Sequence, residues 1–404
     1  MIHIIDKSKC CGCNACVQSC PKQCITMEED EEGFLYPIVN QSFCIECKQC
    51  EQVCPVTNTH DSRRPLQVFA AKNRNEEQRL RSSSGGIFIL LAEHIIEQGG
   101  VVFGARFDKN WEVEHVYAET LKELEPLMRS KYVQSRISNT YKEAKQFLKQ
   151  GKQVMFVGTP CQIAGLKKYL QKEYENLLTV DFICHGVPSP KVWRKYLEEI
   201  KLNQNKNKDN GKNTVLTSLL KSQSVITDIN FREKQLGGYS WKKFGFVING
   251  KLPFMGNLDS VLLSTNVDNN IYMKAFLQNY ILRPSCYSCF AKNGKSKSDI
   301  TVSDFWGLDL CLPDFDDDKG VCAVFLHTKK GINIFESMDI DGIECTFFDG
   351  IRASSYINSA DKPVFRNRFW CKFKNGNTIE KCLEYAQNPP LIVRIISKLK
   401  RTLY

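Results

Sequence analysis

Eight cysteines in the first 55 residues are arranged in two runs with the same internal spacing. The first run, C-x2-C-x2-C-x3-C-P, consists of Cys10, Cys13, Cys16, Cys20 and Pro21. The second consists of Cys44, Cys47, Cys50, Cys54 and Pro55. Thiolate sulfur binds iron in iron–sulfur clusters, and three thiolates on one tight loop bind three irons of a 4Fe–4S cube. The runs therefore indicate two 4Fe–4S clusters and the transfer of single electrons.

The same run occurs in bacterial ferredoxins, where the fourth cysteine of each run binds the other cluster. We therefore predict crossed ligation. One cluster takes Cys10, Cys13, Cys16 and Cys54. The other takes Cys44, Cys47, Cys50 and Cys20. Structural zinc fits less well because zinc knuckles do not use a third cysteine and a proline, and a disulfide framework is typical of secreted chains.

Four further cysteines suit a third metal site in the body of the chain. Cys161 follows a predicted strand in GTPCQ, Cys184 follows another in CHGVPS, and Cys286 and Cys289 form a C-x2-C pair in RPSCYSC. Because the carboxyl ends of neighbouring strands border one crevice, Cys161 and Cys184 are expected side by side. The spacing leaves open a 4Fe–4S cluster, a zinc knuckle or small buried apolar residues.

The remaining cysteines are not needed as ligands. Cys11 and Cys24 lie beside the two runs. The others lie in apolar settings and are expected in the core: Cys311, Cys322, Cys345, Cys371 and Cys382.

A serine- and glycine-rich segment, residues 82–86, precedes a helix predicted for residues 87–97. Hydroxyls, glycine amides and a helix N-terminus together favour phosphate. The expected contacts with a nucleotide or flavin phosphate are Ser83, Ser84, Gly85 and Gly86, with Gly158 and Thr159 near the same ligand. The alternative is an ordinary serine N-cap.

Strand and helix signals alternate around these residues. Strands are predicted for residues 68–72, 101–107, 113–117, 153–158, 177–183, 226–232 and 244–248. Further helices are predicted for 142–149, 163–174, 191–201 and 271–281. The alternation favours an α/β core with a partly parallel sheet. The predicted fold class is α+β and α/β, a small ferredoxin-type module with two 4Fe–4S clusters fused to a larger mixed α/β flavin and iron–sulfur domain.

The expected organisation has four parts. A ferredoxin domain covers residues 1–57, a polar linker 58–67, the α/β domain 68–350 with a polar insertion at 202–213, and a C-terminal extension 351–404. The last residues, 391–404, carry four basic residues and no acid, which predicts a basic helix. Such a helix either packs on its own domain or makes a peripheral membrane contact.

Composition and charge narrow the functional classes. The chain has 404 residues, of which 42% are hydrophobic. Its sequence shows neither an apolar run long enough to span a bilayer nor a secretory signal. Its nineteen cysteines are typical of a reducing compartment, so we expect a cytoplasmic location. Residues 1–60 contain eight acids and four lysines and so carry a net charge of −4. Because the whole chain carries +10, the remaining residues carry +14. A basic body favours an anionic partner or merely solvates the surface. No interleaving of basic and aromatic residues indicates nucleic-acid binding.

Six ordered motifs across residues 68–310 resemble the beta subunits of coenzyme F420 hydrogenases and dehydrogenases. The motifs are RSSSGGIF, SKYVQS, VGTPCQIAGL, CHGVPSP, RPSCYSC and SDFWG. The resemblance implies FAD and a 4Fe–4S cluster in the body, hence three clusters in all, and it makes the Ser-Gly segment and the Gly158-Thr159 turn FAD contacts. Relatives of this architecture also accompany polysaccharide-synthesis enzymes in bacteria without the deazaflavin.

Two functions follow from these features. The first is an iron–sulfur flavoenzyme that exchanges electrons with a donor or acceptor protein and, through FAD, with an organic substrate or deazaflavin-like coenzyme. The second is an electron-transfer subunit without a substrate of its own. No residue is predicted to be catalytic. His185 is either a proton relay or, more simply, a structural histidine.

Overall fold

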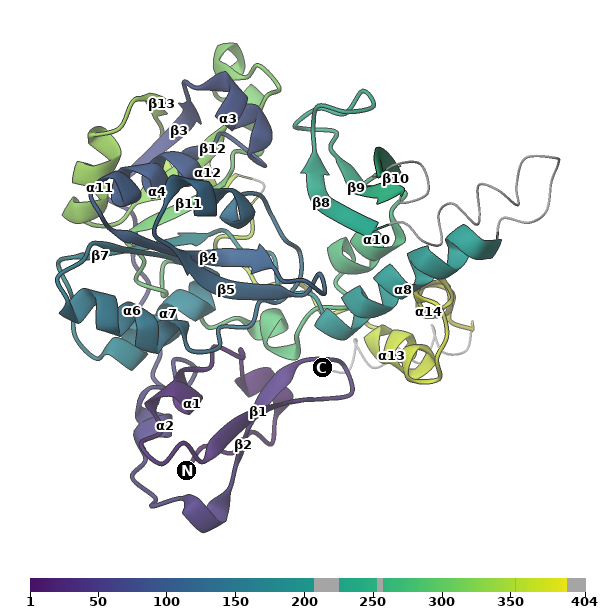
Figure 1. Ribbon diagram of the computed structural model, residues 1–404, viewed down its shortest axis with the longest axis horizontal. Coiled ribbons are helices and arrows are strands. Elements are labelled where there is room, and N and C mark those ends of the chain that lie inside the picture. Colours follow the sequence, from purple (N-terminus) through teal and green to yellow (C-terminus); the bar gives the residue numbers. More distant parts are fainter. Residues whose placement is uncertain (207–224, 253–256, 353, 391–404) are drawn as a thin grey trace, which may run out of the picture.

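The computed structural model describes residues 1–206, 225–252, 257–352 and 354–390. A small N-terminal module lies beneath a large body that contains an eight-stranded sheet and a separate three-stranded sheet (Figure 1). This arrangement confirms the predicted architecture, a small ferredoxin-type module fused to a larger mixed α/β domain. Within the part of the chain described, no helix is both long enough and apolar enough to cross a bilayer.

The module is built around its two cysteine runs. Its elements are α1 (Ala15–Ser19), β1 (Ile25–Glu29), β2 (Leu35–Val39) and α2 (Gln49–Gln52), with 3-10 turns at Lys7–Lys9 and Gln41–Phe43. β1 and β2 pair antiparallel as a hairpin. Asn14 and Lys48 occupy the same position in each run and both have left-handed backbone, with φ of 65° and 59°. The two cysteine loops therefore turn in the same way before their helices begin.

The body is organised around strands in the order β13-β3-β12-β11-β7-β6-β4-β5. In chain order they are β3 (Gln67–Asn73), β4 (Val101–Phe107), β5 (Val113–Ala118), β6 (Val154–Gly158), β7 (Leu177–Phe182), β11 (Ile300–Asp304), β12 (Cys322–Leu326) and β13 (Ile340–Glu344). The central neighbours β4, β6, β7 and β11 are parallel, and the outer pairs are antiparallel. The sheet is thus partly parallel, as predicted.

Helices cover both faces of this sheet. α4 (Ile87–Glu97) and α11 (Lys329–Glu336) share a core on one face. α6 (Thr140–Lys149) and α7 (Pro160–Leu170) lie on the other face, toward the module (Figure 1). Coverage of both faces explains why the inner strands are almost continuously apolar. Three short helices complete this part: α3 (Glu76–Arg81), α5 (Leu121–Leu124) and α12 (Phe347–Ile351).

The core beneath α6 and α7 also contains residues of the module. Cys11, Cys13, Ala15 and Val53 are buried in the same cluster as residues of β4, β6, α6 and α7. The module and the body therefore share one hydrophobic core, and burial of this apolar surface stabilises their contact.

A second group of elements lies beside the eight-stranded sheet. It consists of α8 (Pro190–Lys206), β8 (Val225–Glu233), β9 (Gly245–Leu252), β10 (Leu258–Asn266), α10 (Ile271–Leu277), α13 (Arg366–Lys374) and α14 (Ile379–Gln387). Its aromatic core centres on the fully buried Trp193, whose ring lies 5.1 Å from Tyr272 and 5.2 Å from Phe231. These ring contacts hold α8 against the three-stranded sheet.

Several expected boundaries differ from the structure. Residues 202–206 continue helix α8, whereas we expected them in a polar surface excursion; the rest of that insertion and the basic tail lie outside the described residues. The predicted linker runs along the body, since the Arg63 amide donates to the Asn293 carbonyl at 3.3 Å and the Leu66 amide to the Leu326 carbonyl at 2.7 Å. The connection is therefore part of the packed structure.

Candidate iron–sulfur centres and the buried Arg232

The cysteines of the module gather into two groups, each of which takes members from both runs. One hollow is lined by Cys10, Cys13, Cys16 and Cys54, together with Cys11. A second hollow is lined by Cys20, Cys44, Cys47 and Cys50, together with Cys24. We call these the proximal set and the distal set, for the four cysteines in each case. This grouping matches the crossed ligation expected from the sequence, and the ligand assignments themselves stay predictions.

The two sets differ in their exposure to solvent. Cys13, Cys16 and Cys54 of the proximal set are buried, whereas Cys47 of the distal set is exposed. Phe43 and Ile45 beside the distal set are also exposed, at 67% and 57%. Four soft sulfur donors around each hollow fit a 4Fe–4S cluster. An electron would thus enter or leave the module at the distal set.

The four predicted cysteines of the body also come together, and we call them the body set. Burial raises the pKa of Cys286 to about 12 and that of Cys289 to about 11, and the Cys161 thiol contributes to both shifts. Burial also raises the pKa of Cys184, with further contributions from the other three thiols. The four side chains are partly exposed, and thiols gathered this closely lose their protons readily only when a metal compensates the charge. The donor set fits a 4Fe–4S cluster, which stays a prediction.

Local structure explains how each cysteine of the body set is placed. Cys161 lies in the first turn of α7, which begins at Thr159 with a capping box to Gln162. The Thr159 hydroxyl lies 3.2 Å from the Cys161 sulfur. Cys184 follows the end of β7, and the 3-10 turn Pro284–Ser288 carries Cys286, whose sulfur accepts the Val187 amide at 3.4 Å. Two strand ends and one turn therefore converge at the carboxyl edge of the parallel strands.

The proximal set adjoins the body set. Cys11 packs in the shared core with Cys161, and its hydrogen bond with Cys161, followed by burial, raises the pKa of that thiol. A Cβ at Gly165 of α7 would lie 2.8 Å from the Cys13 Cβ and 3.0 Å from its sulfur. Glycine at this position therefore lets the proximal cysteine loop contact the helix that carries Cys161.

The Ser-Gly segment packs against the sheet. A Cβ at Gly85 would lie 2.6 Å from the Ala71 carbonyl oxygen and 2.7 Å from the Cys322 nitrogen. Burial raises the pKa of the Cys322 thiol, against smaller effects of the Ser84 hydroxyl and of the backbone at Ile87 and Gly85. The segment that leads into α4 thus faces the Cys322 thiol, and packing alone favours glycine at position 85. Contacts of this segment with FAD stay a prediction.

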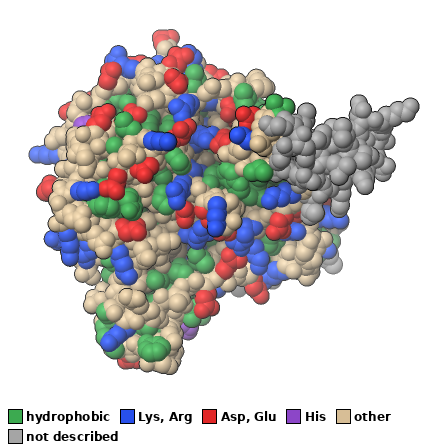
Figure 2. Space-filling view, viewed as in Figure 1, with side chains coloured by type: hydrophobic (Ala, Val, Ile, Leu, Met, Phe, Trp, Pro, Cys, Tyr) green, Lys and Arg blue, Asp and Glu red, His purple; other side chains and the backbone are tan. Residues whose placement is uncertain are grey.

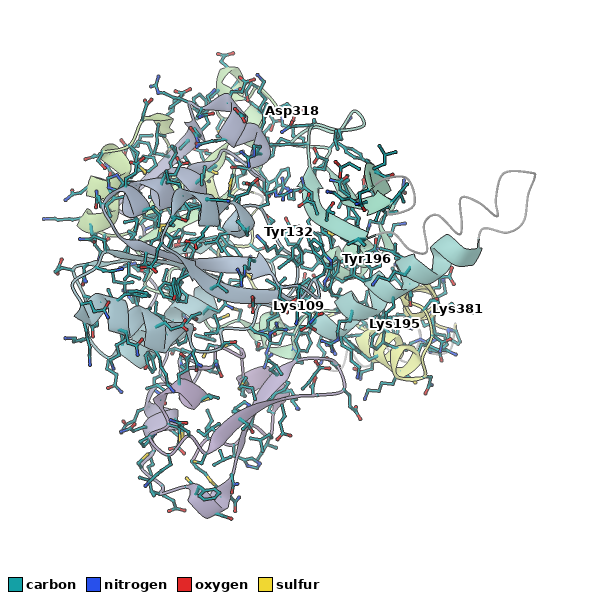
Figure 3. The ribbon with its side chains drawn as sticks, viewed as in Figure 1. Lys109, Tyr132, Lys195, Tyr196, Asp318 and Lys381 are labelled. Carbon is teal, nitrogen blue, oxygen red and sulfur yellow. The ribbon has the colours of Figure 1, made fainter. Side chains whose placement is uncertain are left out.

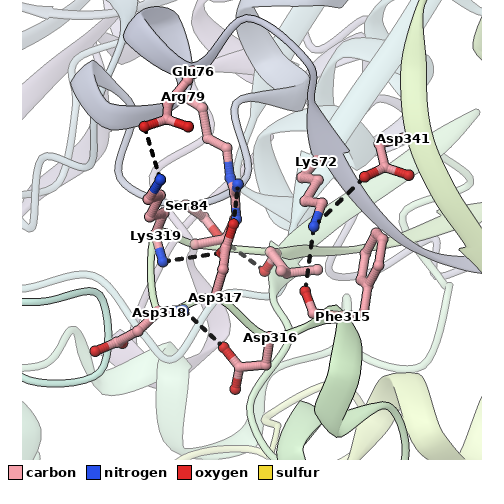
Figure 4. Close-up of polar contacts among 12 residues, drawn as sticks. Lys72, Glu76, Arg79, Ser84, Phe315, Asp316, Asp317, Asp318, Lys319 and Asp341 are labelled. Atoms are coloured by element: carbon pink, nitrogen blue, oxygen red, sulfur yellow. Dashed lines mark hydrogen bonds and ion pairs between the residues drawn. The ribbon is translucent and has the colours of Figure 1, made fainter.

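Ion pairs fix the same segment from the outside (Figure 4). The buried Arg79 pairs with both oxygens of Asp317 and donates its Nε to the Gly320 carbonyl at 2.8 Å. The Ser84 hydroxyl donates to the Val321 carbonyl at 3.0 Å. Of the other predicted contacts, Ser83 accepts the amide of Ser130 at 2.9 Å, and Gly86 starts α4 with φ of 80°.

A buried arginine that sequence reasoning missed lies beside this segment. Arg232 of β8 is 4% exposed and pairs with Asp304 at the end of β11, but its Nε and Nη2 atoms have no hydrogen-bond partner among the described residues. Its guanidinium lies over the rings of Phe244 and Trp306, at 4.1 Å and 5.3 Å. Tyr132 lies between the two sheets in the same region (Figure 3). The SDFWG motif includes Asp304 and Trp306, but nothing in the sequence connects it with Arg232.

Some acidic side chains of the module form ion pairs with basic side chains of the body. The acidic turn of the β1–β2 hairpin pairs with the body through Glu29–Arg194, Glu31–Lys374 and Glu32–Arg366. The visible face of the body carries interspersed basic and acidic side chains (Figure 2). The positive charge of the body is therefore partly neutralised by the acidic module, in addition to any other anionic partner.

Two minor expectations have different outcomes. Cys371 is exposed on the outer side of α13, between buried neighbours, so its expected place in the core was wrong. The His185 Nε2 lies 2.6 Å from the Asn279 side-chain oxygen, and its ring packs edge-on against Phe276. These contacts account for His185 without a proton-relay role.

The fold and the grouped cysteines define an iron–sulfur electron-transfer protein. Residues 151–346 match the family model for the C-terminal part of the beta subunit in coenzyme F420 hydrogenase/dehydrogenase, and residues 9–58 match the 4Fe–4S dicluster domain. These two matches confirm the resemblance predicted from the motifs.

Among solved structures, the chain is similar to one from the F420-reducing NiFe hydrogenase complex of Methanosarcina barkeri, studied by xenon derivatization. The two are 16% identical, the match covers 80% of this chain and 92% of that chain, and the TM-score is 0.41. No curated protein matches the chain.

Proposed function

We propose that the protein is an iron–sulfur flavoprotein oxidoreductase with three 4Fe–4S centres in series. The observation that carries this proposal is the order of the cysteine sets. The distal set faces solvent, the proximal set is buried against α7, and the body set adjoins it at the carboxyl edge of the sheet. Single electrons would pass along this series between a protein partner and the body.

A flavin in the body would convert these single electrons into a two-electron transfer. We place it beside Arg232, where the two unpartnered guanidinium nitrogens offer donors to phosphate or to the ring carbonyls of FAD. Asp304 holds the guanidinium in place, and Trp306 and Phe244 offer apolar surface beside it. The substrate would be an anionic organic molecule or a deazaflavin-like coenzyme; a role in polysaccharide biosynthesis rests on the resemblance alone.

Metal content tests the series of centres. Chain purified without oxygen should contain about twelve irons with matching sulfide, and Cys289→Ala should lose about four of them. Cys371→Ala is the matched control, because Cys371 is exposed and belongs to no set. Eight irons with one zinc would contradict the body cluster.

Flavin content tests this placement of FAD. Arg232→Lys keeps a positive charge beside Asp304 but removes the two free donors, so bound FAD should fall while iron is retained. Arg129→Lys changes another bidentate pair, with Asp228, that is about one-third exposed, and should keep its flavin. Iron without flavin in the wild-type chain would favour the second function, an electron-transfer subunit that supplies a partner enzyme.

A further inference from the structure

Arg283 is a fully buried cation at the contact between module and body. Its side chain is 0% exposed, and it forms no ion pair with a carboxylate among the described residues. Its Nε donates to the Cys10 carbonyl at 2.7 Å, its Nη1 to the Gln134 side-chain oxygen at 3.0 Å and its Nη2 to the Leu35 carbonyl at 2.8 Å. All three nitrogens are thus hydrogen-bonded, but only to neutral groups.

The charge of Arg283 calls for an anion that these neutral groups do not supply. Burial of an ionised side chain is costly unless an opposite charge lies near it. Its Nη2 lies 3.6 Å from the Cys10 sulfur, and the other acidic groups that act on it are Tyr36, Cys11 and Cys286. Cys10 belongs to the proximal set and Cys286 to the body set, and the Arg283 carbonyl accepts the Cys286 amide at 2.9 Å, so this residue connects the two predicted centres.

The other buried arginine at this contact shows the contrast. Arg366 is 4% exposed and also bonds across from the body to the module, but it has a carboxylate partner in Glu32. Its charge is therefore compensated without any cluster. The arrangement around Arg283 differs because the acidic groups that act on it most strongly are cysteine sulfurs and a phenol.

We propose that Arg283 positions the proximal 4Fe–4S centre against the body centre and raises its reduction potential. The proposal rests on the proposed function, since it requires both centres. Reduction adds one electron to the proximal centre without a proton, and a fixed positive charge beside a ligand sulfur stabilises that extra negative charge. The hydrogen bonds to Cys10 and Leu35 fix the loop and the hairpin of the module relative to the turn that carries Cys286, so one side chain sets both distance and potential.

Two substitutions separate charge from shape. Arg283→Met removes the charge and keeps the long apolar stem, and Arg283→Lys keeps the charge and loses the planar fork. Arg366→Met is the control, because it removes a buried arginine from the same contact whose charge partner is a carboxylate. A purely structural role for Arg283 would make its methionine variant resemble the control.

The measurement is a redox titration of the full chain, purified without oxygen and followed by electron paramagnetic resonance. The proximal signal is identified as the one lost in Cys16→Ala. In Arg283→Met the equilibrium constant for reduction of this centre should fall at least about tenfold, which is about 59 mV toward more negative potential. The distal signal should not move, and Arg283→Lys and Arg366→Met should stay near the wild-type potential.

A proximal potential that is unchanged in an iron-replete Arg283→Met variant would overturn the proposal. If Arg283→Met loses its iron, the Arg283→Lys variant decides between the two roles. Wild-type iron content and potential in Arg283→Lys support the proposal. Loss of iron in Arg283→Lys as well would mean that Arg283 is structural, and would overturn the effect on potential. A wild-type chain without the proximal or body cluster would instead overturn the proposed function, and this inference with it.

Discussion

Gly85→Ala should destabilise the protein through packing alone, even without a ligand. The new Cβ would lie 2.6 Å from the Ala71 carbonyl oxygen and 2.7 Å from the Cys322 nitrogen, closer than real Cβ contacts. Ala71 and Cys322 face each other in the β3–β12 ladder, so neither backbone can withdraw without weakening strand pairing. Overpacking of this kind typically costs about 1–3 kcal/mol.

Thermal unfolding of ligand-free protein, followed by circular dichroism, measures the effect. The midpoint should fall by about 1 °C for each kcal/mol lost, because an unfolding entropy of about 2.1 cal/mol/K per residue is summed over 404 residues. Gly342→Ala is the matched control, because Gly342 also faces Ala71 across the sheet but its new Cβ would meet nothing closer than 3.6 Å. Equal midpoints for Gly85→Ala and Gly342→Ala would refute the packing argument and return Gly85 to a purely ligand-binding role.

Three further predictions concern the module and the buried histidines. Cys20→Ala should remove the cluster of the distal set and spare that of Cys10, Cys13 and Cys16; the reverse loss in electron paramagnetic resonance would exclude crossed ligation. Glu32→Gln leaves Arg366 buried without its charge partner and should lower the free energy of unfolding by up to about 3 kcal/mol, while Glu31→Gln, at an exposed pair, should leave it unchanged. Burial lowers the pKa of His115 from 6.5 to about 4, so the unfolded chain binds more protons between these values and stability should fall as the pH drops from 6.5 to 4; an equally steep fall in His115→Gln would assign it to other groups.

Features encoded in short stretches of sequence were predicted well. The cysteine runs need only their own spacing, and the helix at 87–97 and the strand at 101–107 agree with α4 and β4 to the residue. Their ends are marked by Gly86 and by the Gly99-Gly100 pair, which are strong local signals.

Apart from the grouping of the cysteines, features that depend on distant partners were not predicted. β11, β12 and β13 are five residues each and sit in a sheet whose order no local pattern gives. Arg283 is the first residue of the RPSCYSC motif, but its partner Cys10 lies 273 residues away. Likewise, the sequence does not show whether a glycine leaves room for a phosphate or for a neighbouring strand. At Gly85 the space is taken by the backbone of Ala71 and Cys322. Such distinctions arise only when the chain is packed.

The core shared by module and body has a consequence for maturation of the protein. Cys11 and Cys13 cover the start of α7, so a seated module restricts access to the Cys161 thiol. A protein that delivers a preformed cluster has to reach the receiving thiols directly. If the body set binds a cluster, as proposed above, that cluster would be inserted before the module docks. The contact between module and body would then determine the order of assembly.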